Sequence, residues 1–153
     1  MAIELVPLDM TLLSELPAFW ASIPGVGLNP IDDSPAGLRR FLERNPDLCT
    51  VARTADGRLA GTLLCGWDGR RARLYHVCVH PDFRGRGIAQ TMVSDVLRKL
   101  RSMGVVKCDL VCFQDNEIGN AFWGRVGWVR RDDLAYWQMP LETPPPSRTE
   151  ESS

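Results

Sequence analysis

Residues 74–90 read LYHVCVHPDFRGRGIAQ, an apolar strand-like run that is followed by a loop with two glycines and by the start of a helix. Gly85 and Gly87 permit backbone conformations that other residues avoid. Beyond them, apolar residues recur every three or four positions over residues 88–102, which predicts an amphipathic helix. Residues 107–112 form the next strand-like run. This order predicts two parallel strands joined by a helical crossover.

The remaining elements surround this central unit on both sides in the sequence. Apolar runs, alternation and turn residues predict strands at 3–6, 48–54, 59–67, 71–79 and 107–112, helices at 10–19, 35–45, 88–102 and 117–125, and a final hairpin at 128–131 and 136–141. The fold class is therefore α+β, with a mixed, mostly antiparallel sheet and helices on both faces. A single domain is expected over residues 1–142. Residues 143–153, rich in Pro, Ser and Glu, are expected to form a disordered tail.

Length and composition exclude several classes of protein. The chain has 153 residues, of which 44% are hydrophobic and 24% charged, as in an ordinary globular domain. It contains no apolar run near the ~18 residues of a membrane span, and its N-terminus lacks a signal-peptide pattern, so we expect a cytoplasmic protein without a membrane partner. A monomer and a homodimer both remain open.

Charge and cysteine usage narrow the candidate ligands. Residues 70–107 hold nine Lys or Arg against two Asp or Glu, whereas the segments on either side are each acidic. A basic middle favours an anionic ligand, but a net charge of −1 argues against nucleic acid. The five cysteines show no C-x-x-C spacing, and the nearest metal-like group, His76 with Cys78 and His80, has no second ligand pair. We therefore expect no metal site.

The glycine loop at the start of the predicted helix is the main candidate for an anion site. Free N–H groups and the positive dipole end of a helix attract phosphate, and Arg84 and Arg86 add positive charge. The loop lacks the G-x-x-x-x-G-K-[ST] pattern of a Walker loop. A dinucleotide loop stays open as an alternative, with Gln90 in place of its third glycine and Asp109 about 20 residues further on. A structural turn with solvated arginines is the other alternative.

Two segments resemble the GNAT acetyltransferase superfamily. Arg84-x-x-Gly87-x-Ala89 is similar to the acetyl-CoA motif Q/R-x-x-G-x-G/A of that family. Asn116, Gly119, Phe122, Trp123, Gly127 and Trp128 resemble its N-x-x-A-x-x-F-Y-x-x-x-G-F segment. The order of elements also agrees, over about residues 3–141. Residues 66–71 are similar to a subgroup of small bacterial members of unassigned substrate.

The resemblance implies an N-acetyltransferase with acetyl-CoA as cosubstrate. The acceptor would be a primary amine of a small molecule or a peptide, attacking the thioester directly. Strand residues would contact the pantetheine arm and the acetyl carbonyl, the glycine loop would hold the pyrophosphate, and Asn116 would contact the arm or the acceptor. The cofactor-binding residues implied are Val77, Cys78, Val79, Arg84, Gly85, Arg86, Gly87, Ile88, Ala89 and Asn116.

The chain departs from the family at the positions of its usual catalytic residues. Trp123 stands where the family often has a Tyr that protonates the leaving thiolate, and Arg73 and Tyr75 stand where many members have a Glu. Tyr75 and His76 are the catalytic candidates. Strand alternation predicts that Tyr75, Val77 and Val79 share a face of the sheet and that His76 points to the other face. A bulge in the strand would shift the alternation by one residue and change the face of His76. A catalytically weak acyl-CoA-binding module is the alternative function.

Overall fold

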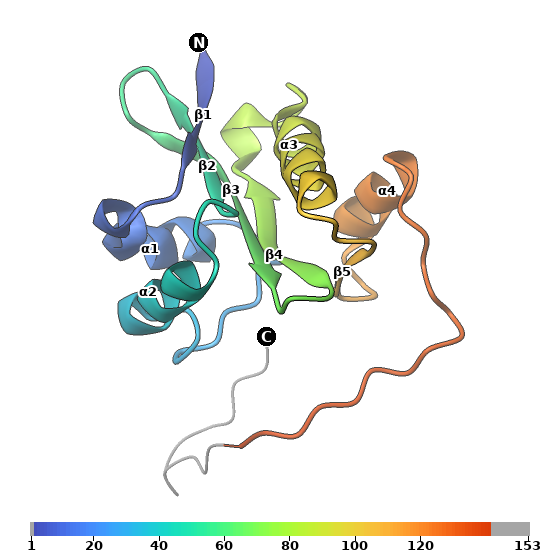
Figure 1. Ribbon diagram of the computed structural model, residues 1–153. Coiled ribbons are helices and arrows are strands. Elements are labelled where there is room, and N and C mark those ends of the chain that lie inside the picture. Colours follow the sequence, from blue (N-terminus) through green and yellow to red (C-terminus); the bar gives the residue numbers. More distant parts are fainter. Residues whose placement is uncertain (1, 142–153) are drawn as a thin grey trace, which may run out of the picture. The chain divides into compact units, whose positions relative to one another are not determined.

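The computed structural model describes residues 2–141, which divide into two units (Figure 1). The first unit runs to Val111 and the second begins at Cys112. The tail predicted at 143–153 lies outside the described residues. The single domain expected over residues 1–142 stays a prediction.

The first unit is built on a five-stranded mixed sheet whose strands lie side by side in sequence order. The strands are β1 (Ile3–Pro7), β2 (Thr50–Thr54), β3 (Leu59–Trp67), β4 (Ala72–Val79) and β5 (Cys108–Leu110). The first three pairings are antiparallel, and β4 pairs with β5 in parallel through the crossover helix α3 (Ile88–Ser102). The structure confirms the predicted α+β fold class and its central strand–helix–strand unit.

Two short helices precede the meander of strands. Helix α2 (Pro35–Arg44) begins where the Ser34 hydroxyl caps the Gly37 N–H at 3.1 Å, with Pro35 in its first turn. The single helix expected at residues 10–19 is instead a 3-10 turn over Met10–Glu15 followed by α1 (Leu16–Ala21). Because Pro17 lacks the N–H that a continuous α-helix would need, it is found in the first turn of α1, where no such bond is required.

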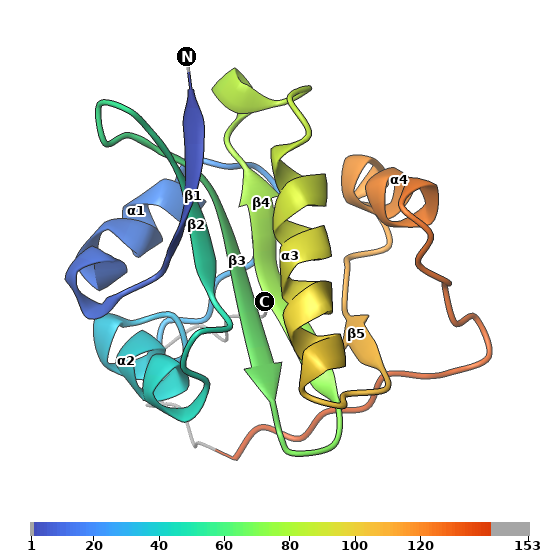
Figure 2. The same cartoon turned by 45° about the horizontal axis from the view of Figure 1, so that its top comes forward.

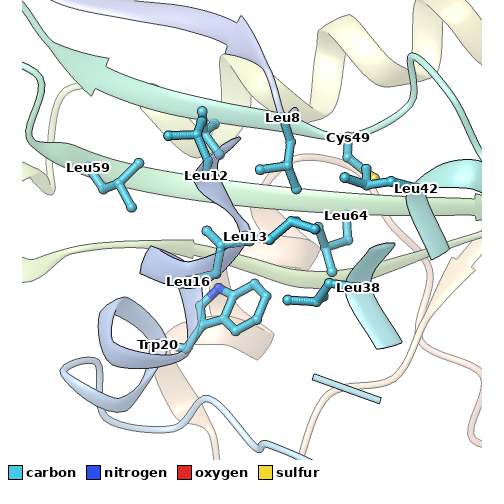
Figure 3. Packing of buried hydrophobic residues seen from close by; sticks show 11 residues of the cluster. Leu8, Leu12, Leu13, Leu16, Trp20, Leu38, Leu42, Cys49, Leu59 and Leu64 are labelled. Atoms are coloured by element: carbon cyan, nitrogen blue, oxygen red, sulfur yellow. The ribbon is translucent and has the colours of Figure 1, made fainter. Parts of the chain in front are cut away.

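The main core lies between the sheet and the helices α1 and α2 (Figure 3). Its fully buried members include Leu16, Val51 and Trp20, and burying each such side chain stabilises the fold by about 1.5–3 kcal/mol. The indole N–H of Trp20 donates to the buried Thr62 hydroxyl of β3 at 2.8 Å. This bond satisfies the one polar group of the tryptophan and fixes α1 to the centre of the sheet.

Helix α3 covers the opposite face of the sheet (Figure 2). Its buried side chains are those of Ile88, Met92, Val93, Val96 and Leu100, which follow the predicted periodicity. A Cβ atom added at Gly61 of β3 would lie 3.3 Å from the Met92 side chain and 2.9 Å from a β4 carbonyl. The helix therefore packs closely on β3 and β4, and helices cover both faces as predicted.

The described residues of the second unit, 112–141, contain one helix, α4 (Glu117–Arg125). The Asn116 side chain caps it by accepting the Gly119 N–H at 2.9 Å, and Trp123 packs edge-on against Phe122 and Trp128. The hairpin expected at 128–131 and 136–141 is wrong, because the described residues after α4 contain no strand. A strand forms only where a neighbouring strand pairs with its backbone N–H and C=O groups. The apolar residues of this segment do not provide such a neighbour, and Trp137 is among the most exposed residues of the described chain.

Candidate functional site

The loop between β4 and α3 exposes backbone at the start of a long helix. Gly85 and Gly87 have φ angles of 80° and 75°, in the left-handed region that glycine tolerates best. A Cβ at either position would have no atom within 4 Å, so the loop leaves room above its backbone. Gly87 is the N-cap of α3, and no side chain among residues 2–141 caps it. The first N–H groups of α3 are therefore available to an anion.

Basic side chains surround this loop. The Arg84 Nε atom donates to the Val79 carbonyl at 3.3 Å, which ties the loop to the end of β4. The guanidinium groups of Arg58 and Arg86 lie over the ring of Phe83, at 4.9 and 5.6 Å from its centroid. Asp82 accepts a hydrogen bond from Arg58 at 2.6 Å, and this bond holds the pKa of the aspartate below its usual value. The loop therefore combines open backbone donors with positive charge.

Strand β4 parts from β5 immediately before this loop. The two strands pair only over residues 72–74 of β4 and 108–110 of β5. Strand β4 continues to Val79, so over residues 75–79 its edge toward β5 has no strand partner in the described part of the chain. The backbone groups of Val77 and Val79 lie in this stretch. An extended ligand could satisfy such groups, as an added strand would.

A bulge at His76 marks the point where β4 leaves β5. The pairing of β3 with β4 shifts by one residue between Leu64, opposite Tyr75, and Thr62, opposite Cys78. His76 has a φ of 47°, an uncommon value for a residue other than glycine. The buried Thr62 hydroxyl donates to the His76 carbonyl at 2.8 Å and holds this conformation. The strict alternation expected for residues 75–79 is therefore broken.

The bulge turns the His76 ring toward α1 and the loop before α2. The ring lies 4.5 Å from that of Trp20, and its Nε2 atom lies 2.8 Å from Oδ1 of Asp33. The His76 and Asp33 side chains are only 16% and 11% exposed. The second carboxylate oxygen of Asp33 accepts the Asn29 N–H at 2.8 Å. Sequence reasoning missed this pair, since Asp33 is 43 residues away and serves locally as part of a helix start.

Tyr75 and Cys78, which lie near His76 on β4, differ in their contacts and in their suitability as reactive groups. Tyr75 contacts the ring of Phe41 edge-on, with the ring centroids 5.7 Å apart. Burial raises the pKa of the Cys78 thiol to about 11, although hydrogen bonding with Thr62 opposes the shift. A thiol with that pKa stays protonated near neutral pH, so Cys78 is a poor nucleophile.

The other predicted site residues fall into two groups. Residues 77–79 and 84–89 all lie in the first unit, along β4 and the loop that follows it. Asn116 and Trp123 lie in the second unit, where the Asn116 oxygen is used as a helix cap. Within residues 2–141, no group of three or more His, Cys, Asp or Glu side chains could hold a metal ion. The same part of the chain contains no helix that is long and apolar enough to cross a membrane.

Known proteins resemble this chain in sequence and in fold. A sequence model described as the Acetyltransferase (GNAT) family matches residues 17–128. An acetyltransferase of Sodalis glossinidius is 35% identical over 107 residues, which are 70% of this chain and 75% of that protein.

Solved structures share the fold at lower identity. The PaiA N-acetyltransferase of Thermoplasma acidophilum, solved in complex with coenzyme A, aligns with a TM-score of 0.70 at 20% identity, over 83% of this chain and 89% of that one. An aminoglycoside antibiotic 6'-N-acetyltransferase of Acinetobacter baumannii aligns with a TM-score of 0.73 at 17% identity, over 92% of this chain and 100% of that one. The chain therefore belongs to the GNAT acetyltransferase family and is an acyl-CoA-dependent N-acyltransferase.

Proposed function

We propose that this chain transfers the acetyl group of acetyl-CoA to a primary amine of a small molecule or a peptide. The observation that carries the proposal is the course of β4, which leaves β5 after Leu74 and continues with an open edge to Val79, where the loop that leads to α3 begins. Such an edge can bind an extended pantetheine arm, and the helix start can bind a pyrophosphate. The open space above Gly85 and Gly87 fits this use of the loop.

In this proposal, each part of the first unit has a separate role. The N–H groups of residues 84–89, with Ile88 and Ala89 at the start of α3, hold the pyrophosphate, and the side chains of Arg84 and Arg86 add charge. Backbone groups of Val77, Cys78 and Val79 contact the pantetheine arm and donate to the thioester carbonyl oxygen, where negative charge develops during attack. Asn116 of the second unit is proposed to contact the arm or the acceptor.

We assign proton removal from the amine to His76. An Nε2–H that donates to Asp33 leaves the lone pair on Nδ1, and a positioned imidazole is a suitable base near neutral pH. The amine nitrogen bonds to the carbonyl carbon as the C–S bond breaks, and the thiolate leaves with the electron pair of that bond. The amine proton passes to the imidazole, and solvent protonates the thiolate. Tyr75 lines the acceptor side next to His76.

Ligand-induced stabilisation tests the proposal. Acetyl-CoA should raise the melting temperature, because a ligand that binds only the folded state at 100 times its Kd stabilises it by about 2.7 kcal/mol. NAD and ATP are the controls, and stabilisation by NAD without any by acetyl-CoA would contradict the proposal. Release of free thiol across a panel of amines then tests turnover. Binding without thiol release would favour the alternative of a catalytically weak acyl-CoA-binding module. Trp123, which stands where the family often has a Tyr acid, supports that alternative.

A further inference from the structure

A cavity of about 380 Å³ lies between the end of α2 and the hairpin that joins β3 to β4. Its walls include the rings of Phe41, Trp67 and Tyr75, and its charged lining residues are Arg44, Asp68, Arg71, Arg73 and Asp109. All of these residues belong to the first unit. None of the roles proposed above uses the charged residues of this cavity.

The acidic residues of the cavity already have partners. The Asp68 carboxylate accepts the backbone N–H groups of Arg70 and Arg71 at 2.8 and 2.9 Å, and these bonds hold the pKa of Asp68 below its usual value. The Asp109 carboxylate accepts a hydrogen bond from the Arg73 Nε atom at 2.6 Å. Asn45 is also engaged, since its side-chain oxygen accepts the Trp67 N–H at 2.7 Å. Both carboxylates that line the cavity are therefore already hydrogen-bonded, and neither is left for a cationic ligand.

Two of its positively charged side chains, in contrast, have no acidic partner within the described residues. The guanidinium groups of Arg44 and Arg71 form no ion pair with any residue of the described chain. A guanidinium presents a planar fork of donors that fits a carboxylate. The aromatic walls and the two arginines together fit a ligand with an extended body and an anionic end.

The cavity begins beside the proposed site of reaction. Tyr75, which lines it, directly precedes His76 at the bulge and follows the last β4 residue that is paired with β5. Tyr75 lies four positions after Arg71, which corresponds to about 13 Å of extended backbone. A ligand that reaches both ends must be several bonds long, and three residues of extended peptide span roughly 10 Å.

We infer that this cavity is the acceptor subsite and that it selects an amine carrying a distal carboxylate, such as a short peptide with a free C-terminus. The inference rests on the proposed function, since it places the amine next to His76 and the carboxylate at Arg44 and Arg71. Selection comes from the carboxylate, because a neutral amide end leaves both guanidinium groups without a charged partner.

Triglycine and triglycine amide test the inference, because they differ only at the end that should face the arginines. Binding of each to the full chain, with and without coenzyme A, is measured by NMR titration, which also follows weak ligands. We expect the acid to bind at least ~10-fold more tightly than the amide. Arg44→Ala and Arg71→Ala should each remove most of that preference. Arg70→Ala is the matched control, since Arg70 is the neighbour of Arg71 on the same turn but does not line the cavity.

Equal binding of the acid and the amide, no binding of either, or an equal loss in the Arg70→Ala variant would overturn the inference. Circular dichroism confirms that each variant is folded. The affinity of the same proteins for acetyl-CoA is titrated separately. Normal acetyl-CoA binding without the carboxylate preference would refute the acceptor subsite alone, whereas failure to bind acetyl-CoA would refute the proposed function.

Discussion

Replacing Asp33 by Asn tests the proposed role of the His76–Asp33 pair with little change in shape. The Asp33 carboxylate accepts two N–H groups, one from the His76 ring and one from the Asn29 backbone, each at 2.8 Å. An amide has only one oxygen. When that oxygen keeps the Asn29 N–H, the NH₂ group faces Nε2 of His76, and the ring takes the tautomer that accepts there, with its proton on Nδ1. Exchanging bonds to a carboxylate for bonds to a neutral amide costs about 1 kcal/mol. In a chain of this size, that corresponds to a melting temperature lower by about 2–4 °C.

The same substitution should slow acetyl transfer. A positioned general base contributes about 10²–10⁴-fold to a rate, and a ring with its proton on Nδ1 no longer offers a lone pair at that atom. We expect kcat to fall by about 10–100-fold, with the KM for acetyl-CoA unchanged.

Thiol release at neutral pH is the assay, and Asp32→Asn is the matched control. Asp32 is the exposed neighbour of Asp33, and its carboxylate forms no ion pair within residues 2–141. A wild-type rate in Asp33→Asn, or an equal loss in Asp32→Asn, would refute the assignment of proton removal to His76.

Further predictions concern stability. A Cβ at Gly37 would lie 2.4 and 2.5 Å from the backbone carbonyl oxygens of Ile31 and Asp32, so Gly37→Ala should lower the free energy of unfolding by about 1–3 kcal/mol. Gly124→Ala, which has open space around it in α4, should raise the free energy of unfolding slightly. Equal effects of the two substitutions in denaturant melts would contradict the close approach at Gly37. Burial raises the pKa of the Cys65 thiol from 9.0 to about 12, so this thiol stabilises the fold below pH 9 and loses that contribution as the pH rises toward 12. Cys65→Ala should make the melting temperature fall less steeply between pH 9 and 11, and an unchanged slope would argue against the buried thiol.

Much of the fold could be predicted from local patterns. The period of helix α3, the glycine at each hairpin turn and the strand–helix–strand order each depend on residues close together in the sequence. The motif around Gly87 could be found for the same reason. The contacts that hold the candidate site together could not, because Thr62, Trp20 and Asp33 reach His76 from distant segments.

Two features show why local patterns fail elsewhere. A bulge adds one residue to β4 and reverses the expected face of His76, and no residue type at positions 75–78 marks it. The apolar residues at 128–141 resemble strands, yet a strand forms only where a neighbour pairs with its backbone. In both cases the outcome depends on pairing between segments, which alternation along a single segment does not specify.

The most direct test of the central claim is a calorimetric titration of acetyl-CoA into the wild-type protein, Gly87→Glu and Arg86→Ala. Gly87→Glu places a carboxylate at the start of α3, where the pyrophosphate should bind, while the open surroundings of Gly87 limit its cost to the fold to about 1–2 kcal/mol of backbone strain. We predict a folded Gly87→Glu variant that loses binding by 100-fold or more, estimated from about 3 kcal/mol of blocked donors and charge repulsion. Arg86→Ala should lose about tenfold or less, because its charge is partly screened by solvent. Wild-type affinity in a folded Gly87→Glu variant would contradict the assignment of residues 84–89 to the phosphate site.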